Sequence, residues 1–433
     1  MASIKTDRLV IFCGAGISMA QPSRVPSGAE LAQNCSRQYN LITGAAVSGD
    51  ARQDLERLAA FFFQNTTTFS LFIEHLIPWH RFRRDPNRGH SAVADFLACG
   101  VIDFAVTTNL DALVEVAAEQ LGEHDFLAAL DGEEANRARP HQPYLKMHGC
   151  GIRDRDNTLW TSAQLDTEPI NSRIETAANW LRGHLIQRDV LVIGFWSDWG
   201  YLNEVLVNCV SESRPSMVVL VDPEERDRLE EKAPQLWAWA HHEGVEFQHV
   251  QESGNEFLED LRHRFSRQML LTCFENSRDR YVVLTGETCD QLLALDPTIS
   301  TEDLYALRKD FSGVPSTNIV RKKTHDAGML LIGAIHILLM SRGAQLDGSV
   351  YIFAEMRIRL INGNGDLISY VQNEFRSEPA LQPPVHIVIC INAQEDGGVP
   401  SDVIRGKTES SIVRPTSESE WHTLESAREL LGI

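Results

Sequence analysis

Residues 8–18 read Arg-Leu-Val-Ile-Phe-Cys-Gly-Ala-Gly-Ile-Ser and indicate how the chain begins to fold. The apolar run that ends at Cys13 is typical of a strand buried on both faces, as in a parallel sheet covered by helices. Gly14 and Gly16 follow directly, and glycines at a strand end let the backbone turn tightly and approach a pyrophosphate. A Gly-x-Gly of this kind is as often a plain turn, and the third glycine of the dinucleotide fingerprint is absent.

Outward from this stretch, β-rich runs alternate with helical segments over two-thirds of the chain, which predicts an α/β domain with a parallel sheet. We expect further strands at residues 101–107, 144–147, 189–194 and 217–221, and helices within 54–80 and 170–187. The pattern changes near residue 277. We therefore predict two domains, an α/β domain at 1–277 and a separate α+β domain at 278–433.

Within the second predicted domain, the expected elements are short and mixed. They are a strand at 280–286, a buried helix at 327–341, a hairpin of 350–361 and 367–371 around Asn362-Gly-Asn-Gly, a strand at 386–391 and a helix at 420–431. No internal repeat is apparent.

Composition excludes several classes of function. The net charge is -20, with 60 acidic against 40 basic residues, so direct binding of nucleic acid is not expected. None of the eight cysteines forms a C-x-x-C pair, which indicates buried thiols in a reducing compartment rather than a metal site. The N-terminus lacks a signal-peptide core, and the apolar run 328–340 is too short to cross a bilayer. We expect a cytoplasmic protein without membrane contact.

Polar motifs follow several of the predicted strands, where the carboxyl ends of parallel strands border a ligand crevice. In Thr107-Thr108-Asn109-Leu110-Asp111 an amide precedes a carboxylate by two residues. This pair can position a carboxamide, a water or a ribose hydroxyl. The alternative is that Asn109 or Asp111 only caps the helix that follows.

His148 follows the strand at 144–147, and its imidazole can take a proton from a hydroxyl or a water. A lone histidine is more often structural. Gly194-Phe-Trp-Ser-Asp198 and Asp222 follow the next two strands. They can border a nucleotide, or they can be ordinary strand-ending turns.

Taken in order, Gly-Ala-Gly-Ile-Ser, Thr-Asn-x-Asp, His-Gly, Gly-x-x-Ser and a strand-end Asp resemble the sirtuin family over residues 8–225. The resemblance implies a Rossmann-like doubly wound sheet that holds NAD across its carboxyl edge. It implies that Gly14, Ala15, Gly16 and Ser18 hold the phosphates, that Asn109 and Asp111 face the nicotinamide ribose, and that His148 is the base. It also implies that Thr108 contacts the cofactor and that Gly194, Ser197 and Asp222 border the adenosine half.

The chain also departs from the protein deacetylases of that family. Met19-Ala-Gln-Pro-Ser-Arg stands where those enzymes have Gly-Ile-Pro-Asp-Phe-Arg, and their paired C-x-x-C zinc module is missing. These departures resemble the sirtuin-like domains of bacterial anti-phage effectors, which hydrolyse NAD. The resemblance implies an NAD+ glycohydrolase that forms nicotinamide and ADP-ribose, with Asn109 and His148 as the catalytic pair and no metal.

Two other functions stay open. One is protein deacylation or ADP-ribosyl transfer, and the other is a non-catalytic NAD or nucleotide sensor. An enzyme that empties the NAD pool needs restraint, so we expect the second domain to act through homo-oligomerisation or a regulatory partner. The resemblance suggests a helicase-type ATPase, an Argonaute-type protein or a nucleotide-sensing protein as that partner.

Overall fold

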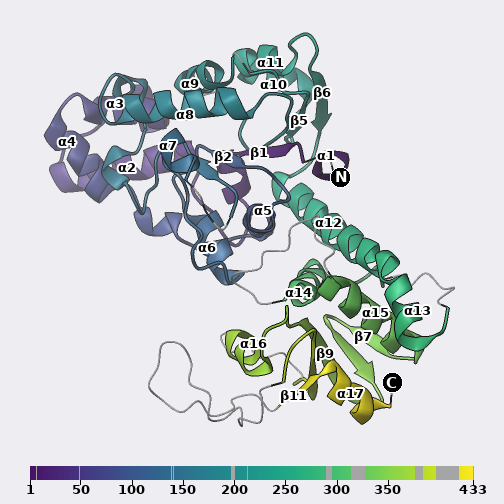
Figure 1. The fold of residues 1–433 in the computed structure, drawn as a ribbon. Helices are drawn as coiled ribbons and strands as arrows, with labels where there is room; N and C mark the ends of the chain where they lie inside the picture. The colour runs from purple at the N-terminus through teal and green to yellow at the C-terminus, as the bar shows by residue number, and fades with distance from the viewer. Residues whose placement is uncertain are drawn as a thin grey trace. The chain divides into compact units, whose positions relative to one another are not determined.

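The computed structural model divides the chain into two compact units, Met1–Leu261 and Arg262–Ile433 (Figure 1). The described residues are 1–433 without 6, 48, 138, 140, 197–199, 212, 289–294, 314–326, 376–383, 396–418 and 433. The division falls inside α12 (Gly254–Asn276), upstream of the boundary after residue 277 that the sequence pattern predicts. One helix therefore contributes residues to both units.

The first unit contains a six-stranded sheet in which every pair of neighbouring strands is parallel, in the order β3-β2-β1-β4-β5-β6. The strands are β1 (Leu9–Cys13), β2 (Ala105–Thr107), β3 (Tyr144–Lys146), β4 (Asp189–Ile193), β5 (Met217–Val221) and β6 (Glu246–Val250). The first five are the predicted strands. The sequence did not indicate β6, because this edge strand is partly exposed and has no continuous apolar run.

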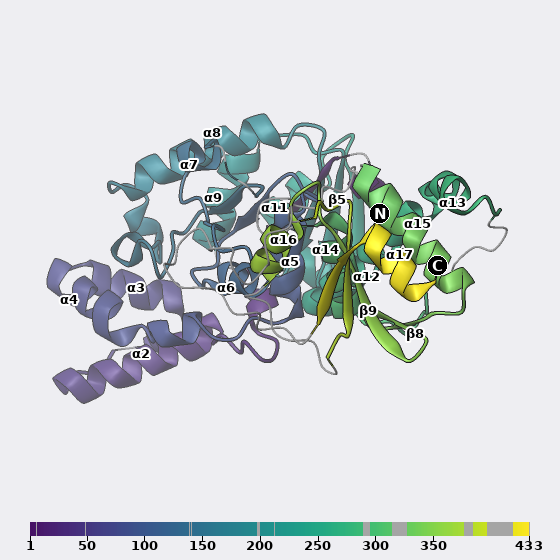
Figure 2. The same cartoon turned by 60° about the horizontal axis from the view of Figure 1, so that its bottom comes forward.

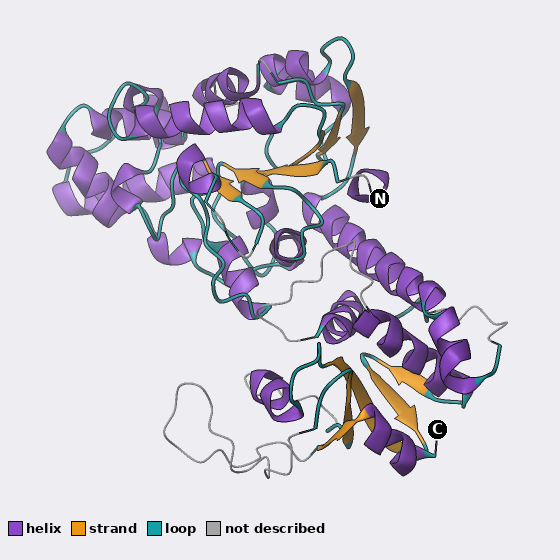
Figure 3. Cartoon of the chain, viewed as in Figure 1, coloured by secondary structure: helices purple, strands orange, loops and turns teal. Residues whose placement is uncertain are grey.

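Helices flank both faces of this sheet, which confirms the predicted doubly wound, Rossmann-like class (Figure 3). In β3, Leu145 faces the large apolar cluster on one side, whereas Lys146 points the other way and pairs with Glu115 of α6. The helices are α1 (Ala2–Lys5), η1 (Ala15–Ser18), α2 (Gly28–Thr43), η2 (Gly49–Arg52), α3 (Leu55–Phe63), α4 (Thr66–Leu71), η3 (Phe72–Leu76), η4 (Trp79–Phe82), α5 (Arg88–Ala98), α6 (Leu113–Gln120), α7 (Gly132–Ala135), η5 (Arg155–Asn157), η6 (Ser162–Gln164), α8 (Ile170–His184), α9 (Gly200–Val210), α10 (Arg226–Lys232) and α11 (Pro234–Ala240).

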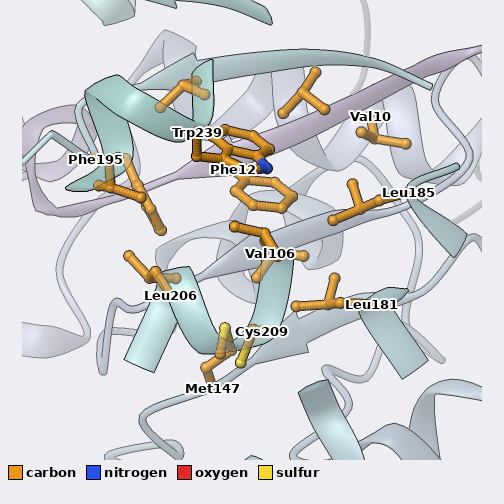
Figure 4. Packing of buried hydrophobic residues seen from close by; sticks show 14 of the residues in the cluster. Val10, Phe12, Val106, Met147, Leu181, Leu185, Phe195, Leu206, Cys209 and Trp239 are labelled. Carbon is orange, nitrogen blue, oxygen red and sulfur yellow. The ribbon is translucent and has the colours of Figure 1, made fainter. Parts of the chain in front are cut away.

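The largest core of the first unit lies between the sheet and α8, α9 and α11. Figure 4 shows Phe12 of β1 and Val106 of β2 packed against Leu181, Leu206 and Trp239 of these helices. All five side chains are at most 8% exposed. Burial of such large apolar surfaces holds the strands in register, so the residues that follow each strand have fixed positions.

A second apolar cluster joins the helices of residues 28–82, which follow the first strand and its turn. Helices α2, α3 and α4 lie together in both views (Figures 1 and 2). Phe62 of α3 stacks on Phe72 of η3, with ring centroids 5.2 Å apart. Leu110 and Trp160 complete the same cluster and come from the loops after β2 and β3. The cluster therefore fixes two loops that border the carboxyl edge of the sheet.

The second unit has a mixed five-stranded sheet with helices, which agrees with the predicted α+β class. Its order is β11-β10-β9-β8-β7, parallel from β9 to β11 and antiparallel from β7 to β9. The elements are α13 (Arg278–Thr285), α14 (Thr301–Ser312), α15 (Ala327–Ser341), β7 (Gln345–Asp347), β8 (Val350–Phe353), β9 (Met356–Asn362), α16 (Ile368–Glu374), β10 (Ile387–Ile391), β11 (Glu420–Thr423) and α17 (Leu424–Leu431).

Three predictions for the second unit need correction. Residues 280–286 belong to helix α13 and its cap, not to a strand, because Tyr281 is its one buried residue and the neighbouring valines face outward. The hairpin turn lies at Ala354-Glu355 between β8 and β9, both with positive φ, and not at residues 362–365. Residues 368–371 lie in helix α16 rather than in a strand. In the segment predicted as a helix, residues 420–423 form strand β11 and only residues 424–431 form helix α17.

Two general features concern the cysteines and the apolar helices. The seven cysteines that the structure describes are all buried and unpaired by disulfides. Within the described ranges, no helix combines the length and the apolar character that crossing a membrane requires.

Candidate active site

The predicted polar motifs gather at the carboxyl edge of the first sheet. Cys13 at the end of β1 pairs with Thr107 on one side and with Ile193 on the other, and Thr107 pairs in turn with Lys146. The turn after β1, Asn109 after β2, His148 after β3 and Gly194 after β4 therefore occupy equivalent positions along one edge. This is the edge at which open parallel sheets bind their ligands.

Ser18 is the centre of a buried network of four polar side chains. Its Oγ donates to Asp111 Oδ2 at 2.9 Å, accepts from Asn109 Nδ2 at 3.1 Å and lies 3.0 Å from His90 Nε2. All four residues are at most 6% exposed. These side chains come from η1, α5 and the β2–α6 loop, so the fold brings together residues more than 70 positions apart.

His90 was not predicted, and its hydrogen bonds fix its protonation. The backbone N–H of Asn87 donates to His90 Nδ1 at 3.1 Å, which makes this nitrogen an acceptor. Burial lowers the pKa of His90 to about 3, so the ring is neutral and its single proton is on Nε2. His90 therefore donates to Ser18. No strand end or motif marks this residue, because it lies in the first turn of α5, where it completes a capping box with Asn87.

This pattern sets the orientation of the Asn109 amide. Since the hydroxyl hydrogen of Ser18 goes to Asp111, Ser18 must accept from Asn109, and the Nδ2 group faces Ser18. The backbone N–H of Asn109 donates to Thr107 Oγ1 at 3.0 Å. Its Oδ1 is buried and accepts no hydrogen bond from any described residue. The arrangement thus presents one oriented carbonyl oxygen, which suits a water or a hydroxyl donor.

The carboxylate of Asp111 is already engaged by the protein. Its Oδ2 accepts from Ser18, and its Oδ1 accepts from the backbone N–H of Leu113, the first residue of α6, at 3.2 Å. Burial raises the pKa of Asp111, while the ammonium of Lys146 and the hydroxyl of Ser18 oppose this shift. Asp111 therefore connects the start of α6 to Ser18, and its predicted contact with a ribose stays a prediction.

His148 lies at the end of β3 and is 4% exposed. Burial, together with the nearby charge of Arg173, lowers the pKa of His148 to about 3, so the imidazole is neutral at physiological pH. Its backbone carbonyl accepts from the N–H of Leu159 at 2.9 Å, and Gly149 follows with φ of +86°. A neutral histidine held in this way has a lone pair with which to accept a proton.

The glycines after β1 contact the turn after β4. The amide of Gly14 donates to Ile193 O at 3.0 Å, and the amide of Gly16 donates to Gly194 O at 2.8 Å. A Cβ on Gly14 or Gly16 would lie 2.6 Å from backbone atoms of Gly194 or Phe195. These two amides are therefore used within the protein, whereas Ala15 at the tip of the turn is exposed.

The remaining predicted residues have separate positions. Thr108 is half-buried beside Asn109. Asp222 ends β5, where its Oδ1 accepts from the backbone N–H of Glu224 at 2.9 Å, as in a strand-ending turn. Ser197 lies outside the described residues. In the described part of the chain, no group of three or more His, Cys, Asp or Glu side chains can hold a metal ion.

A parallel sheet with helices on both faces and polar side chains along its carboxyl edge defines a Rossmann-like unit. More specifically, residues 103–246 match the family model of the SIR2-like domain. This segment contains Asn109, Asp111, His148, Gly194 and Asp222. None of the curated proteins compared with the chain gives a match.

Three solved structures illustrate the wider similarity. A Sir2 homologue–NAD complex is 15% identical, with a TM-score of 0.33, over 58% of this chain and 87% of its own. A Sir2–p53 peptide–NAD+ complex is 14% identical, with a TM-score of 0.34, over 61% and 95%. A structure described as the basis for the mechanism and regulation of Sir2 enzymes is 15% identical, with a TM-score of 0.33, over 59% and 90%.

Proposed function

We propose that the first unit binds NAD+ at the carboxyl edge of its sheet and hydrolyses the bond between nicotinamide and ribose. The observation that carries this proposal is the oriented Oδ1 of Asn109, which accepts no hydrogen bond from the described residues. It follows the strand next to that of the neutral His148. The SIR2-like family match supports it, because the matched segment contains both residues. The absence of a paired C-x-x-C module favours hydrolysis over deacylation of a protein substrate.

To cleave this bond, the protein has mainly to position NAD+ and the attacking water. Nicotinamide leaves a cationic pyridinium as a neutral molecule, so the carbon–nitrogen bond breaks with its electron pair going to the ring nitrogen. The ribose then has oxocarbenium character, and a water oxygen bonds to the same carbon. Asn109 Oδ1 accepts a hydrogen bond from this water or from a ribose hydroxyl and orients it. Once the water oxygen has bonded to the ribose carbon it is strongly acidic, and the neutral His148 takes its proton.

The setting of this activity is also part of the proposal. Hydrolysis of NAD+ harms the cell that carries it out, so an active enzyme of this kind needs restraint. This fits a cytoplasmic anti-phage effector whose second domain, placed by the sequence at 278–433, controls activity through oligomerisation or a regulatory partner. The separate compact unit Arg262–Ile433 is available for that role.

The test is to incubate the purified chain with NAD+ over a range of protein concentrations and to separate the products by chromatography. We expect nicotinamide and ADP-ribose in equal amounts, and a loss of at least about 100-fold in Asn109→Ala and His148→Ala. His75→Ala, at an exposed histidine outside the network, serves as the matched control. Activity that survives in both catalytic variants would show that the assigned pair is wrong. Binding of NAD+ without any turnover would favour the sensor.

A further inference from the structure

Arg173 is a buried cation that the proposed reaction does not use. It lies in the first turn of α8, and its side chain is 6% exposed. Burial lowers the pKa of Arg173, while Asp154 and Asp131 oppose that shift, and a guanidinium remains protonated in proteins. A buried charge of this kind requires hydrogen-bond partners on all sides.

Only part of the guanidinium has such partners. Its Nη1 forms an ion pair with Asp154 Oδ2 at 3.4 Å. Its Nε and Nη2 are buried, and no described residue accepts a hydrogen bond from either. The N–H groups on these two nitrogens point in the same direction, because the guanidinium is planar. One whole edge of Arg173 is thus without a partner among the described residues.

The guanidinium of Arg173 lies close to His148. A Cβ on Gly149, the residue after His148, would lie only 3.1 Å from Arg173 Nη1. The guanidinium is therefore packed directly against the backbone that follows the candidate base. Its charge also contributes, after burial, to the lowered pKa of His148.

Two parallel N–H groups at this spacing match the two oxygens of a carboxylate, which accepts both in a bidentate pair. A neutral carboxamide offers one acceptor oxygen and one donor, and so satisfies only half of the edge. The charge and the geometry of Arg173 thus favour the same chemical group.

We propose that the Nε/Nη2 edge of Arg173 binds a carboxylate of a ligand that lies beside His148. The inference rests on the proposed function for the nature of the adjoining site. Two sources offer this chemistry. One is a dinucleotide whose pyridine ring carries a carboxylate in place of the carboxamide, and the other is a small carboxylic acid that binds beside NAD+.

Calorimetric titration distinguishes these sources without requiring turnover. The probes are nicotinic acid adenine dinucleotide against NAD+, and succinate against succinamide in the presence of NAD+. We expect wild type to bind the carboxylate member of at least one pair about 10-fold more tightly. Arg173→Met should remove this preference. Arg173→Lys should lose most of it, since lysine keeps the charge but not the paired N–H groups.

The control is Arg153→Met, which removes a neighbouring cation that already pairs with Glu134, and it should keep the preference. If Arg173→Met does not fold, as judged by circular dichroism, Arg173→Lys carries the comparison. The inference is overturned if wild type binds the carboxylate and the carboxamide of each pair with equal affinity. It is also overturned if the preference for the carboxylate persists in the Arg173 variants. Loss of NAD+ hydrolysis with the preference intact counts against the proposed function alone.

Discussion

At the scale of single residues, the hydroxyl of Ser18 connects side chains that are distant in sequence. It accepts hydrogen bonds from Asn109 and His90 and donates one to Asp111. Because its own hydrogen goes to Asp111, this oxygen can only accept from the Asn109 side chain, which holds Nδ2 toward Ser18. The direction of Asn109 Oδ1 is therefore a property of the network and not of Asn109 alone.

We therefore expect Ser18→Ala to affect both stability and turnover. It leaves buried N–H groups of Asn109 and His90 unpaired, which costs about 1–3 kcal/mol of unfolding free energy. The released amide should lower kcat for NAD+ cleavage about 10–100-fold with a small change in KM. Urea unfolding and steady-state kinetics measure the two effects. Ser213→Ala is the control, because this buried Oγ donates only to Val210 O, and kcat should stay within about twofold.

The neutral His148 makes a prediction about pH. A free histidine becomes protonated near pH 6.5, whereas burial and Arg173 lower the pKa of His148 to about 3. We expect kcat/KM to show no acidic limb from this residue between about pH 8 and about pH 5. A decline with an apparent pKa near 6.5 that disappears in a His148 variant would contradict this assignment.

The sequence could locate part of this site because strand ends can be recognised. Asn109, Asp111 and His148 follow apolar runs, and parallel strands place such residues on one edge. His90 could not be found in this way, since a histidine inside a helix has no distinguishing pattern. The role of Ser18 was also out of reach, because it depends on contacts with residues 72 to 93 positions away.

At the scale of elements, the turns after β1 and β4 touch through their backbones. Gly14→Ala would place a Cβ 2.6 Å from Gly194 O and Phe195 Cα, neither of which can move without shifting β4. We expect a loss of at least about 2 kcal/mol in unfolding free energy. Gly183→Ala is the control, because nothing lies within 4 Å of the added Cβ. That variant should gain about 0.5 kcal/mol as a helical alanine. Thermal unfolding of both variants checks this contrast.

The β8–β9 turn contains a strained pair of residues. Ala354 and Glu355 have φ of 49° and 67°, and non-glycine residues with a side chain rarely adopt this region. Two central residues with positive φ suit Asn-Gly in a two-residue hairpin. We expect the double substitution Ala354→Asn and Glu355→Gly to stabilise the second unit by about 1 kcal/mol, as measured by urea unfolding. No gain, or a loss, would mean that the turn has a different conformation.

These elements also show which helices and strands can be recognised from the sequence. Apolar residues make up β5, all of β4 after Asp189 and nearly all of α15, so these elements can be recognised from the sequence. In α13, by contrast, the valines suggest a strand, but Val283 is 77% exposed and the segment continues as a helix after Ser277. The Ala-Glu turn was missed for a similar reason. Its positive φ values follow from the pairing of the strands and not from turn-forming residues.

At the scale of the whole molecule, buried histidines link stability to pH. His90 and His148 in the first unit and His336 in the second all have their pKa lowered to about 3 by burial. Between about pH 6.5 and about pH 3 the unfolded chain binds protons that the native chain does not, so stability decreases as pH falls. Each fully titrating histidine removes about 1.4 kcal/mol per pH unit.

We accordingly expect both units to lose unfolding free energy between pH 7 and pH 5, with little change between pH 8 and pH 7. Denaturant titrations at each pH measure this dependence. Replacing His336 with Phe should reduce the acid sensitivity of the second unit, whereas His75→Gln, at an exposed position, should leave that of the first unit unchanged. Equal sensitivity in wild type and the His336 variant would contradict this account.

The buried cysteines can report when each unit opens, because their thiols react with an alkylating reagent only when exposed. Burial raises the pKa of Cys13, Cys35 and Cys209 to about 12, so little thiolate is present for an alkylating reagent to meet while the fold is closed. Cys390 lies in the strand core of the second unit. Short pulses of iodoacetamide followed by peptide mass spectrometry should then record how often each unit opens, residue by residue, without any introduced label.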